Sequence, residues 1–187
     1  SYQPEERKFA CYVGGLTAVR GVKEMIQACD RAGVKLVLAG EFDNTEYFNQ
    51  IKAMPEWENV DFLGYVPNAE VGEKVYKRAS VGLVLLHKAP NHTHSIPIKQ
   101  FEYMQAGLPV IASREVLFCK QVTEEENCGL VVDPLNIDEV AQAIRTITSD
   151  SELAKQMSAN AKQASADKYN WLSQEKSLLE FYQSLFD

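Results

Sequence analysis

Glu102 is the carboxylate whose surroundings in the sequence best suit it to ligand binding. It lies inside a short predicted helix that follows a polar loop and that Gly107 and Pro109 end sharply. Ser95 fits the N-cap position of that helix, whose first turn presents unpaired backbone N–H groups and the positive end of the helix dipole. Such a helix start binds anions. We therefore predict that residues 95–98 meet a nucleoside diphosphate and that Glu102 accepts hydrogen bonds from a pair of hydroxyls.

Arg20 is the cation placed to contact the same ligand. The predicted strand 9–13 runs into Gly14 and Gly15, and Arg20 precedes the helix that follows. This turn is not Gly-x-Gly-x-x-Gly, so the dinucleotide fingerprint is absent. Arg20 either grips a phosphate or is an ordinary surface arginine at a helix start.

The three histidines, His87, His92 and His94, fall in one loop after a predicted buried strand. A metal site would need a third or fourth ligand and residues that orient the ligands, and no cysteine or clear carboxylate is nearby in the sequence. We expect no metal and no cofactor. The loop either contacts the substrate or is an ordinary polar loop.

Apolar strand-like segments alternate with amphipathic helical ones along most of the chain. The predicted strands are 9–13, 34–39, 60–63, 81–86, 110–112 and 130–132, and the predicted helices are 22–32, 44–53, 69–79, the Glu102 helix, 137–148, 152–166 and 171–186. Strands that are apolar on both faces and separated by helices indicate a doubly wound parallel sheet with helices on both faces, here with a helical carboxyl-terminal tail. Ligands of such sheets bind at the carboxyl ends of the strands. Gly14, Gly40, Gly64, the histidine loop and Ser113 fall there, so we expect one crevice to collect them.

Composition limits the possible functions. The 187 residues are 45% hydrophobic, which suffices for a sizeable core, and the net charge of −7 without a basic stripe disfavours nucleic-acid binding. No apolar run approaches the roughly 20 residues that span a bilayer, and the amino terminus lacks the apolar core of a signal peptide. The four cysteines are widely spaced in or beside apolar segments, which indicates buried thiols in a reducing cytoplasm. We interpret residues 1–8 as a linker and residues 9–187 as one domain.

Residues 99–113, read as Lys-x-x-Glu-Tyr-Met-x-Ala-Gly-x-Pro-Val-Ile-Ala-Ser, resemble the signature segment of retaining family 4 glycosyltransferases of the GT-B fold. In that family two glutamates stand eight positions apart: the first contacts the donor sugar and the second accepts hydrogen bonds from the nucleotide ribose. The resemblance implies the ribose role for Glu102 and places the sugar contact at His94. The chain departs from the family there, because an imidazole cannot accept hydrogen bonds from two hydroxyls as a carboxylate can. The alternative is that Glu102 is only a solvated helix residue.

The first glycine turn also resembles that of the family. There an arginine follows the glycine, a second basic residue precedes a later glycine, and both cations grip the diphosphate. Here Gly15 takes the place of the arginine and Arg20 matches the second basic residue. One cation is therefore lost, or replaced by Lys23 or Lys99.

Two further segments carry the resemblance. The turn after residues 60–63 resembles the family's base-binding turn, which implies that backbone groups of Tyr65 and Val66 face the base. Tyr169, Asn170 and Trp171 resemble a terminal aromatic motif, after which the family's last helix packs toward the partner domain. A plain core-packing helix, with Trp171, Leu172, Leu178, Leu179 and Phe181 inward, explains the same pattern.

The resemblance implies a Rossmann-like, nucleotide-sugar-binding domain that is the carboxyl-terminal half of a hexosyltransferase of polysaccharide biosynthesis. It would bind a UDP- or GDP-linked sugar and act on a glycan or lipid-linked acceptor held by a missing amino-terminal domain, so the isolated chain would be inactive. Any peripheral membrane contact would come through that missing half. The implied substrate-binding residues are Gly14, Gly15, Arg20, Tyr65, Val66, His94, Ser95, Ile96, Pro97, Ile98 and Glu102, with no catalytic residue assigned to this chain. Two alternatives stay open: a stand-alone nucleotide-sugar-binding or regulatory module, and half of a GT-B nucleotide-sugar epimerase.

Overall fold

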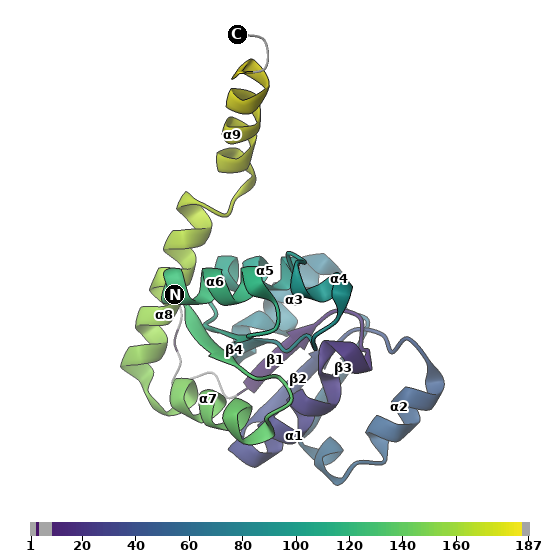
Figure 1. Cartoon of the computed structure of the whole chain (residues 1–187). Coiled ribbons are helices and arrows are strands. Elements are labelled where there is room, and N and C mark those ends of the chain that lie inside the picture. Colours follow the sequence, from purple (N-terminus) through teal and green to yellow (C-terminus); the bar gives the residue numbers. More distant parts are fainter. Residues whose placement is uncertain (1–2, 4–8, 185–187) are drawn as a thin grey trace.

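A six-stranded parallel sheet forms the centre of the structure, a computed structural model that describes residue 3 and residues 9–184 (Figure 1). The strand order is β3-β2-β1-β4-β5-β6, and every pair of neighbours is parallel. The strands are β1 (Phe9–Val13), β2 (Lys35–Ala39), β3 (Val60–Gly64), β4 (Ala79–Val84), β5 (Val110–Ser113) and β6 (Gly129–Val132). The chain order reverses between β1 and β4, which is where ligands bind in doubly wound sheets.

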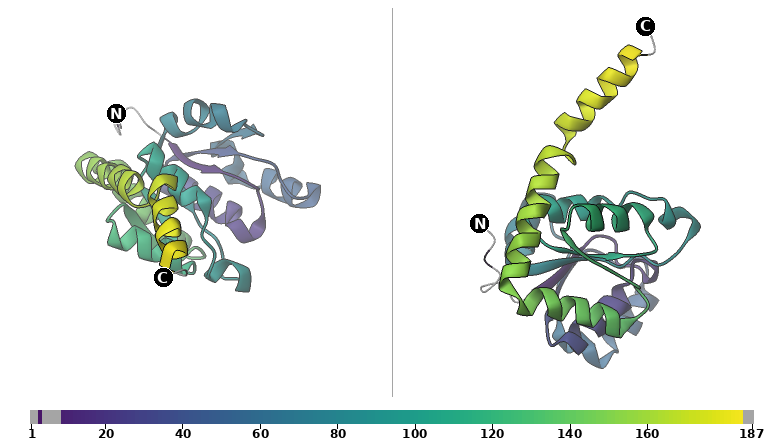
Figure 2. Two further views of the ribbon diagram at one scale, coloured as in Figure 1. Left: turned by 90° about the horizontal axis from the view of Figure 1, so that it is seen from above. Right: turned by 60° about the vertical axis from the view of Figure 1, so that its left-hand side comes forward.

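Helices cover both faces of this sheet, as Figure 2 shows. One face carries α1 (Val22–Ala32) and α7 (Ile137–Ser149), and the other carries α3 (Asn68–Lys74), α5 (Ile98–Ala106) and α6 (Leu117–Glu125). All six residues of β4 are buried, because this central strand is covered on both faces. The predicted α/β, Rossmann-like fold with a helical carboxyl-terminal tail is confirmed.

Local signals account for most element boundaries. Helix α1 buries Val22, Met25, Ile26 and Cys29 at helical spacing and ends at Gly33, whose φ of 71° is left-handed. Helix α2 (Thr45–Lys52) begins after Asn44, whose side chain accepts a hydrogen bond from the Tyr47 N–H.

The structure differs from the predicted elements in three places. Helix α6 was not predicted, because Val116 precedes it without a side-chain cap and so the sequence lacks a start signal. The predicted helix 69–79 divides into α3 and a 3₁₀ helix, η4 (Tyr76–Arg78), because Val75 departs from helical geometry between them. The histidine loop contains one short helix, α4 (Pro90–Thr93), and β4 stops at Val84.

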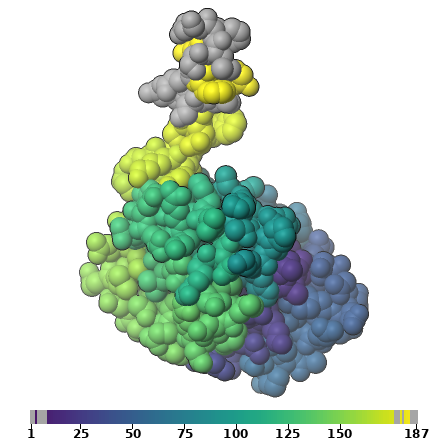
Figure 3. Space-filling view, viewed as in Figure 1, coloured from purple at the N-terminus to yellow at the C-terminus, as the bar shows by residue number. Residues whose placement is uncertain are grey.

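Two helices follow α7 at the end of the described chain. Helix α8 (Ser151–Asp167) packs against α5, and α9 (Trp171–Ser184) projects away from the sheet and its covering helices (Figures 1 and 3). Trp171 is 75% exposed, and Leu172, Leu179 and Phe181 are also exposed. The interpretation of α9 as a core-packing helix is therefore wrong, and the side chain of Leu178 lies outside the described part of the structure.

The predicted linker, residues 1–8, also lies outside the described residues except for residue 3, so it stays a prediction. No helix within the described part of the chain combines the length and apolar character that crossing a membrane requires. All four cysteines are buried and free, as predicted.

Candidate functional site

Two cavities lie side by side at the carboxyl ends of the strands. The first has a volume of about 480 Å³ and is lined by Tyr12, Arg20, Val84, Leu86, Asn91, His92, Ser95, Ile96, Pro97, Ile98, Lys99 and Glu102. The second, of about 450 Å³, is lined by Val13, Gly14, Gly15, Thr17, Ala39, Gly40, Glu41, Phe42, Asp43, Tyr65, Val66, Asn68 and Lys99. Lys99 lines both, so we call the pair the Lys99 cleft. The crevice predicted at this edge of the sheet is present in part: Gly14, Gly40 and the histidine loop line it, whereas Gly64 lines neither cavity and Ser113 is buried.

Glycines allow the strand ends to approach closely on one side of the cleft. The Gly14 N–H donates to the Ala39 carbonyl at 3.0 Å, and the Gly40 N–H donates to the Gly64 carbonyl at 2.8 Å. Gly40 has a φ of 144°, and a Cβ atom there would lie 1.8 Å from the Gly14 oxygen. This position therefore requires glycine, both for its backbone conformation and for space.

Arg20 lies exposed at the end of the 3₁₀ helix η2 (Ala18–Arg20), beside the glycine turn. Its Nη1 donates to the Tyr12 hydroxyl at 3.4 Å, and that hydroxyl donates to the Gly15 carbonyl at 3.2 Å. Burial raises the pKa of Tyr12, which keeps the hydroxyl neutral. Arg20 forms no ion pair with any carboxylate in the described part of the chain. Its charge is therefore available to an anion in the cleft.

Helix α5 begins two residues later than expected. Its first residue is Ile98 and Pro97 occupies the N-cap, without a side-chain cap. The Ser95 hydroxyl instead donates to the His92 carbonyl at 2.8 Å, so the expectation that Ser95 caps the helix is wrong. Residues 95–98 nevertheless line the first cavity, and no side chain of the described residues caps the backbone N–H groups at the start of the helix.

The buried face of α5 also differs from the predicted one. The sequence pattern favoured Ile98, Phe101, Met104 and Gln105, but Ile98 is 70% exposed in the cleft and the residues buried are Gln100, Tyr103 and Met104. The Gln100 Nε2 group donates to the Thr123 hydroxyl at 3.0 Å and to the Cys119 carbonyl at 3.2 Å, both on α6, whereas its buried Oε1 has no hydrogen-bond partner among the described residues.

Tyr103 anchors α5 to the sheet. Its hydroxyl accepts a hydrogen bond from the Val13 N–H at 3.3 Å. Its ring packs against Gly82 of β4, where an added Cβ atom would lie 2.4 Å from the ring. Helix α5 is thereby held against the end of β1.

Glu102 is held in a defined orientation. Its Oε2 accepts hydrogen bonds from Lys99 Nζ at 2.6 Å and from the Tyr76 hydroxyl at 2.8 Å. Its Oε1 has no hydrogen-bond partner among the described residues, and the side chain is 35% exposed. Burial, and then the Glu102 carboxylate, raise the pKa of Tyr76, so Tyr76 stays a neutral donor. Glu102, which lines both the first cavity and a neighbouring one beside Tyr76, therefore has one open acceptor oxygen.

The histidine loop contributes to the cleft through His92. His94 is exposed at the end of α4 and is not among the residues that line either cavity, so a sugar contact there stays a prediction. His87 pairs with Glu24 on α1 at 3.2 Å, away from the cleft lining. The described residues contain no group of three or more histidine, cysteine or acidic side chains that could hold a metal.

The turn after β3 forms the far wall of the second cavity. Gly64 adopts a left-handed φ of 63°, after which Val66 is buried and Tyr65 is 70% exposed. Both line the cavity with Gly14 and Gly15, so the structure brings these four predicted residues together. Whether a base lies against them stays a prediction.

Sequence reasoning missed the contacts of three side chains in or beside the cleft. Tyr12 was assigned only to a strand, but its hydroxyl accepts a hydrogen bond from Arg20 in the cleft. Tyr76 was assigned only to the buried face of a helix, but its hydroxyl donates to Glu102 from a neighbouring cavity. Lys99 was noted only as a possible replacement cation. The i, i+3 spacing of Lys99 and Glu102 was a signal that could have linked them.

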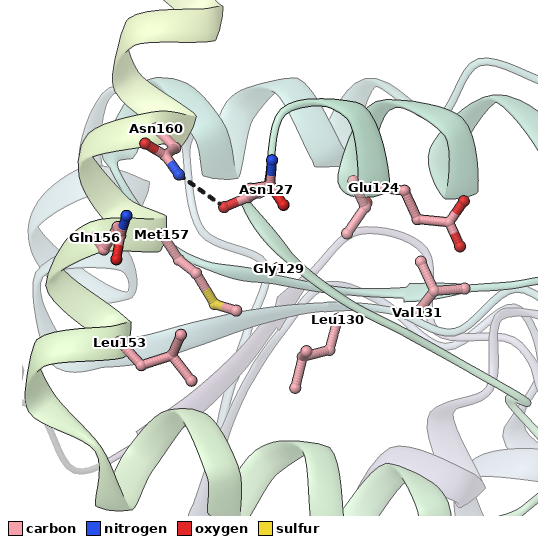
Figure 4. A pocket seen from close by; sticks show the side chains of 10 residues that line it. Glu124, Asn127, Gly129, Leu130, Val131, Leu153, Gln156, Met157 and Asn160 are labelled. Carbon is pink, nitrogen blue, oxygen red and sulfur yellow. Dashed lines mark hydrogen bonds between the residues drawn. The ribbon is translucent and has the colours of Figure 1, made fainter.

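Another cavity, of about 580 Å³, lies away from this cleft between α6, the edge strand β6 and α8 (Figure 4). The Asn160 amide donates to the Asn127 carbonyl at its rim at 3.0 Å. Its described lining contains one charged side chain, the Glu124 carboxylate, and so lacks a cation for a phosphate. The Lys99 cleft is the better candidate for an anionic ligand.

Comparisons with known proteins identify the family and the fold of this chain. The sequence pattern of the family described as glycosyl transferases group 1 matches residues 1–164. The chain belongs to this family. An uncharacterized glycosyltransferase, MJ1607 of Methanocaldococcus jannaschii, is 30% identical over 95% of this chain and 45% of its own length. An alpha-D-kanosaminyltransferase of Streptomyces kanamyceticus is 28% identical over 90% of this chain and 44% of its own length. This glycosyltransferase domain thus spans about half the length of these relatives.

Solved structures share the fold of this glycosyltransferase domain. Sucrose-phosphate synthase of Thermosynechococcus elongatus superposes with a TM-score of 0.81 at 23% identity, covering 99% of this chain and 47% of that one. Anabaena HepE, solved in complex with UDP and glucose, has a TM-score of 0.78 at 16% identity, covering 97% of this chain and 49% of that one. The carboxyl-terminal domain of LpcC, a group 1 protein of Francisella tularensis, has a TM-score of 0.72 at 17% identity and covers 88% of both chains. The predicted GT-B fold of the carboxyl-terminal type is confirmed.

Proposed function

We propose that this chain is the donor-binding half of a retaining, family 4 glycosyltransferase. It binds a nucleoside diphosphate sugar, and the complete protein transfers the hexosyl group to a glycan or lipid-linked acceptor. One observation carries the proposal: Arg20, the start of α5 and Glu102 line a single cavity at the carboxyl ends of β1 and β4.

Each part of the ligand has a matching part of the cleft. Arg20 and the N–H groups at the start of α5 would bind the diphosphate, since both present positive charge to one cavity. The open Oε1 of Glu102 would accept a ribose hydroxyl, and Oε2 would accept a second one beside the Tyr76 hydroxyl. The base would lie toward Tyr65 and Val66, in the second cavity.

Transfer would need the rest of the protein. An acceptor hydroxyl must come within about 3–3.5 Å of the sugar's anomeric carbon, and the Lys99 cleft forms one wall around the donor. The relatives are about twice as long as this chain, which supports a second, acceptor-binding domain with any membrane contact on that half. We place the protein in the cytoplasm, in polysaccharide biosynthesis, and the isolated chain should bind donor without transferring it.

Calorimetric titration tests this proposal. The chain is titrated with UDP, GDP and ADP, with their hexose conjugates, and with the free nucleosides. We expect one nucleoside diphosphate to bind more tightly than its nucleoside. Absence of binding to every diphosphate would refute the proposal, and sugar transfer by the isolated chain with acceptor supplied would refute its half-enzyme part. Epimerisation of a donor without acceptor would instead favour the epimerase alternative.

A further inference from the structure

The Lys99 cleft has few positive charges for an anionic ligand. Its described lining contains two permanently basic side chains, Arg20 and Lys99, and three carboxylates, Glu41, Asp43 and Glu102. A diphosphate adds further negative charge to this surplus. Both cations would therefore favour its binding in a partly desolvated cleft, in addition to the N–H groups at the start of α5.

Lys99 occupies the centre of the cleft. It is the second residue of α5 and the one residue in the described lining that both cavities share. Its side chain is 23% exposed, and its ammonium lies 2.6 Å from Glu102 Oε2. An ammonium has three donors on a flexible stem, so it can keep one hydrogen bond to a carboxylate while it donates others to phosphate oxygens.

The glycine turn offers no alternative cation. Gly15 has no side chain, and a Cβ built there would meet only the Arg20 guanidinium, at 3.9–4.0 Å. Lys23, the other basic residue near the turn, is exposed on α1 and lines neither cavity. Lys99 on α5 is therefore the second permanently basic side chain in the described lining of the cleft.

We infer that Lys99 is a diphosphate-binding residue of this cleft, and that Glu102 positions its ammonium before the nucleotide arrives. This inference rests on the proposed function. When the diphosphate binds, the ammonium shifts part of its hydrogen bonding from Glu102 Oε2 to the phosphates, and the Tyr76 hydroxyl keeps Glu102 in place. The Lys99 ammonium thus moves in part from the Glu102 carboxylate to the phosphate, which frees that carboxylate for the ribose hydroxyls. The diphosphate and the ribose hydroxyls are thereby recognised together.

The test compares a diphosphate with its nucleoside. Calorimetry measures the Kd of UDP and of uridine, or of the GDP or ADP pair if wild type prefers it, for wild type, Lys99→Met, Lys99→Arg and the control Lys23→Met. We expect Lys99→Met to weaken diphosphate binding tenfold or more while the nucleoside Kd changes less than twofold. Lys99→Arg should keep most of the affinity because it keeps the charge, and Lys23→Met should resemble wild type.

The possible failures are distinguishable. Thermal unfolding first confirms that each variant is folded, and Lys99→Arg provides a folded variant if Lys99→Met is not. If wild type binds the diphosphate and a folded Lys99→Met binds it equally well, the inference is wrong and the proposed function stands. If diphosphate and nucleoside lose affinity equally, Lys99 only orients Glu102, which also overturns the inference. If wild type binds no nucleoside diphosphate, the proposed function fails, and the inference fails with it.

Discussion

Replacing Glu102 with alanine should weaken nucleoside diphosphate binding, and the loss should be traceable to the ribose hydroxyls. Hydrogen bonds to a charged acceptor contribute about 1.5–3 kcal/mol each. Glu102 is about one-third exposed and already shares Oε2 with Lys99 and Tyr76, so screening and existing partners lower the gain from two hydroxyls. We expect a net loss of about 1.4–2.8 kcal/mol, or roughly 10- to 100-fold in Kd.

A double-mutant cycle isolates this contribution, because the alanine variant also frees the Lys99 ammonium. Wild type and Glu102→Ala are each titrated with UDP and with 2′-deoxy-UDP, or with the corresponding pair for the preferred base. Wild type should bind the deoxy ligand about fivefold or more weakly, whereas Glu102→Ala should bind both ligands equally. The control is Glu73→Ala, which removes a carboxylate that also pairs with a lysine but lies on the exposed surface of α3. If Glu102→Ala discriminates against the deoxy ligand as strongly as wild type does, Glu102 does not bind the ribose.

Three further outcomes are expected. Arg20→Ala should weaken binding of the diphosphate far more than of the nucleoside, and added salt should shrink that difference because Arg20 is exposed; equal losses in calorimetry would contradict a phosphate contact. Gly40→Ala should lower the free energy of unfolding, measured in urea, by about 2–4 kcal/mol, because residue 40 has a positive φ and the new Cβ would collide with the Gly14 carbonyl. The control Gly72→Ala, in open space on α3, should not destabilise the protein. Burial raises the thiol pKa of Cys119 to about 12 and of Cys128 to about 11, so both should resist a thiolate-specific reagent at pH 8 until urea unfolds the protein; rapid labelling of the folded chain would show that these thiols are accessible.

The sequence by itself was sufficient to predict the parallel sheet and the location of the cleft. Continuous apolar runs and glycine stops are local signals, and they specify six strands whose carboxyl ends share one edge. Gly14, Gly40 and the histidine loop could therefore be assigned to one crevice before their distances were known, whereas Gly64 and Ser113, assigned with them, do not line it. Helix α6 escaped prediction because it begins without a capping residue.

Only the tertiary structure decided how the side chains of the cleft are paired. Tyr76 lies 26 residues before Glu102 in the chain, and only the packing of η4 against α5 brings its hydroxyl to the carboxylate. The buried face of α5 depends on a partner that the periodicity does not reveal, since Gln100 is buried by its hydrogen bond to Thr123 on α6.

Helix α9 also shows that a sequence pattern does not determine which surface a helix packs against. Its apolar pattern is that of a core-packing helix, but Trp171 and Phe181 are exposed in the structure. An amphipathic pattern predicts that one face of a helix is apolar, but it does not predict which surface covers that face. Local sequence thus determined the elements and the edge where a ligand binds, whereas long-range packing determined which oxygen of Glu102 is open and which cation stands beside it.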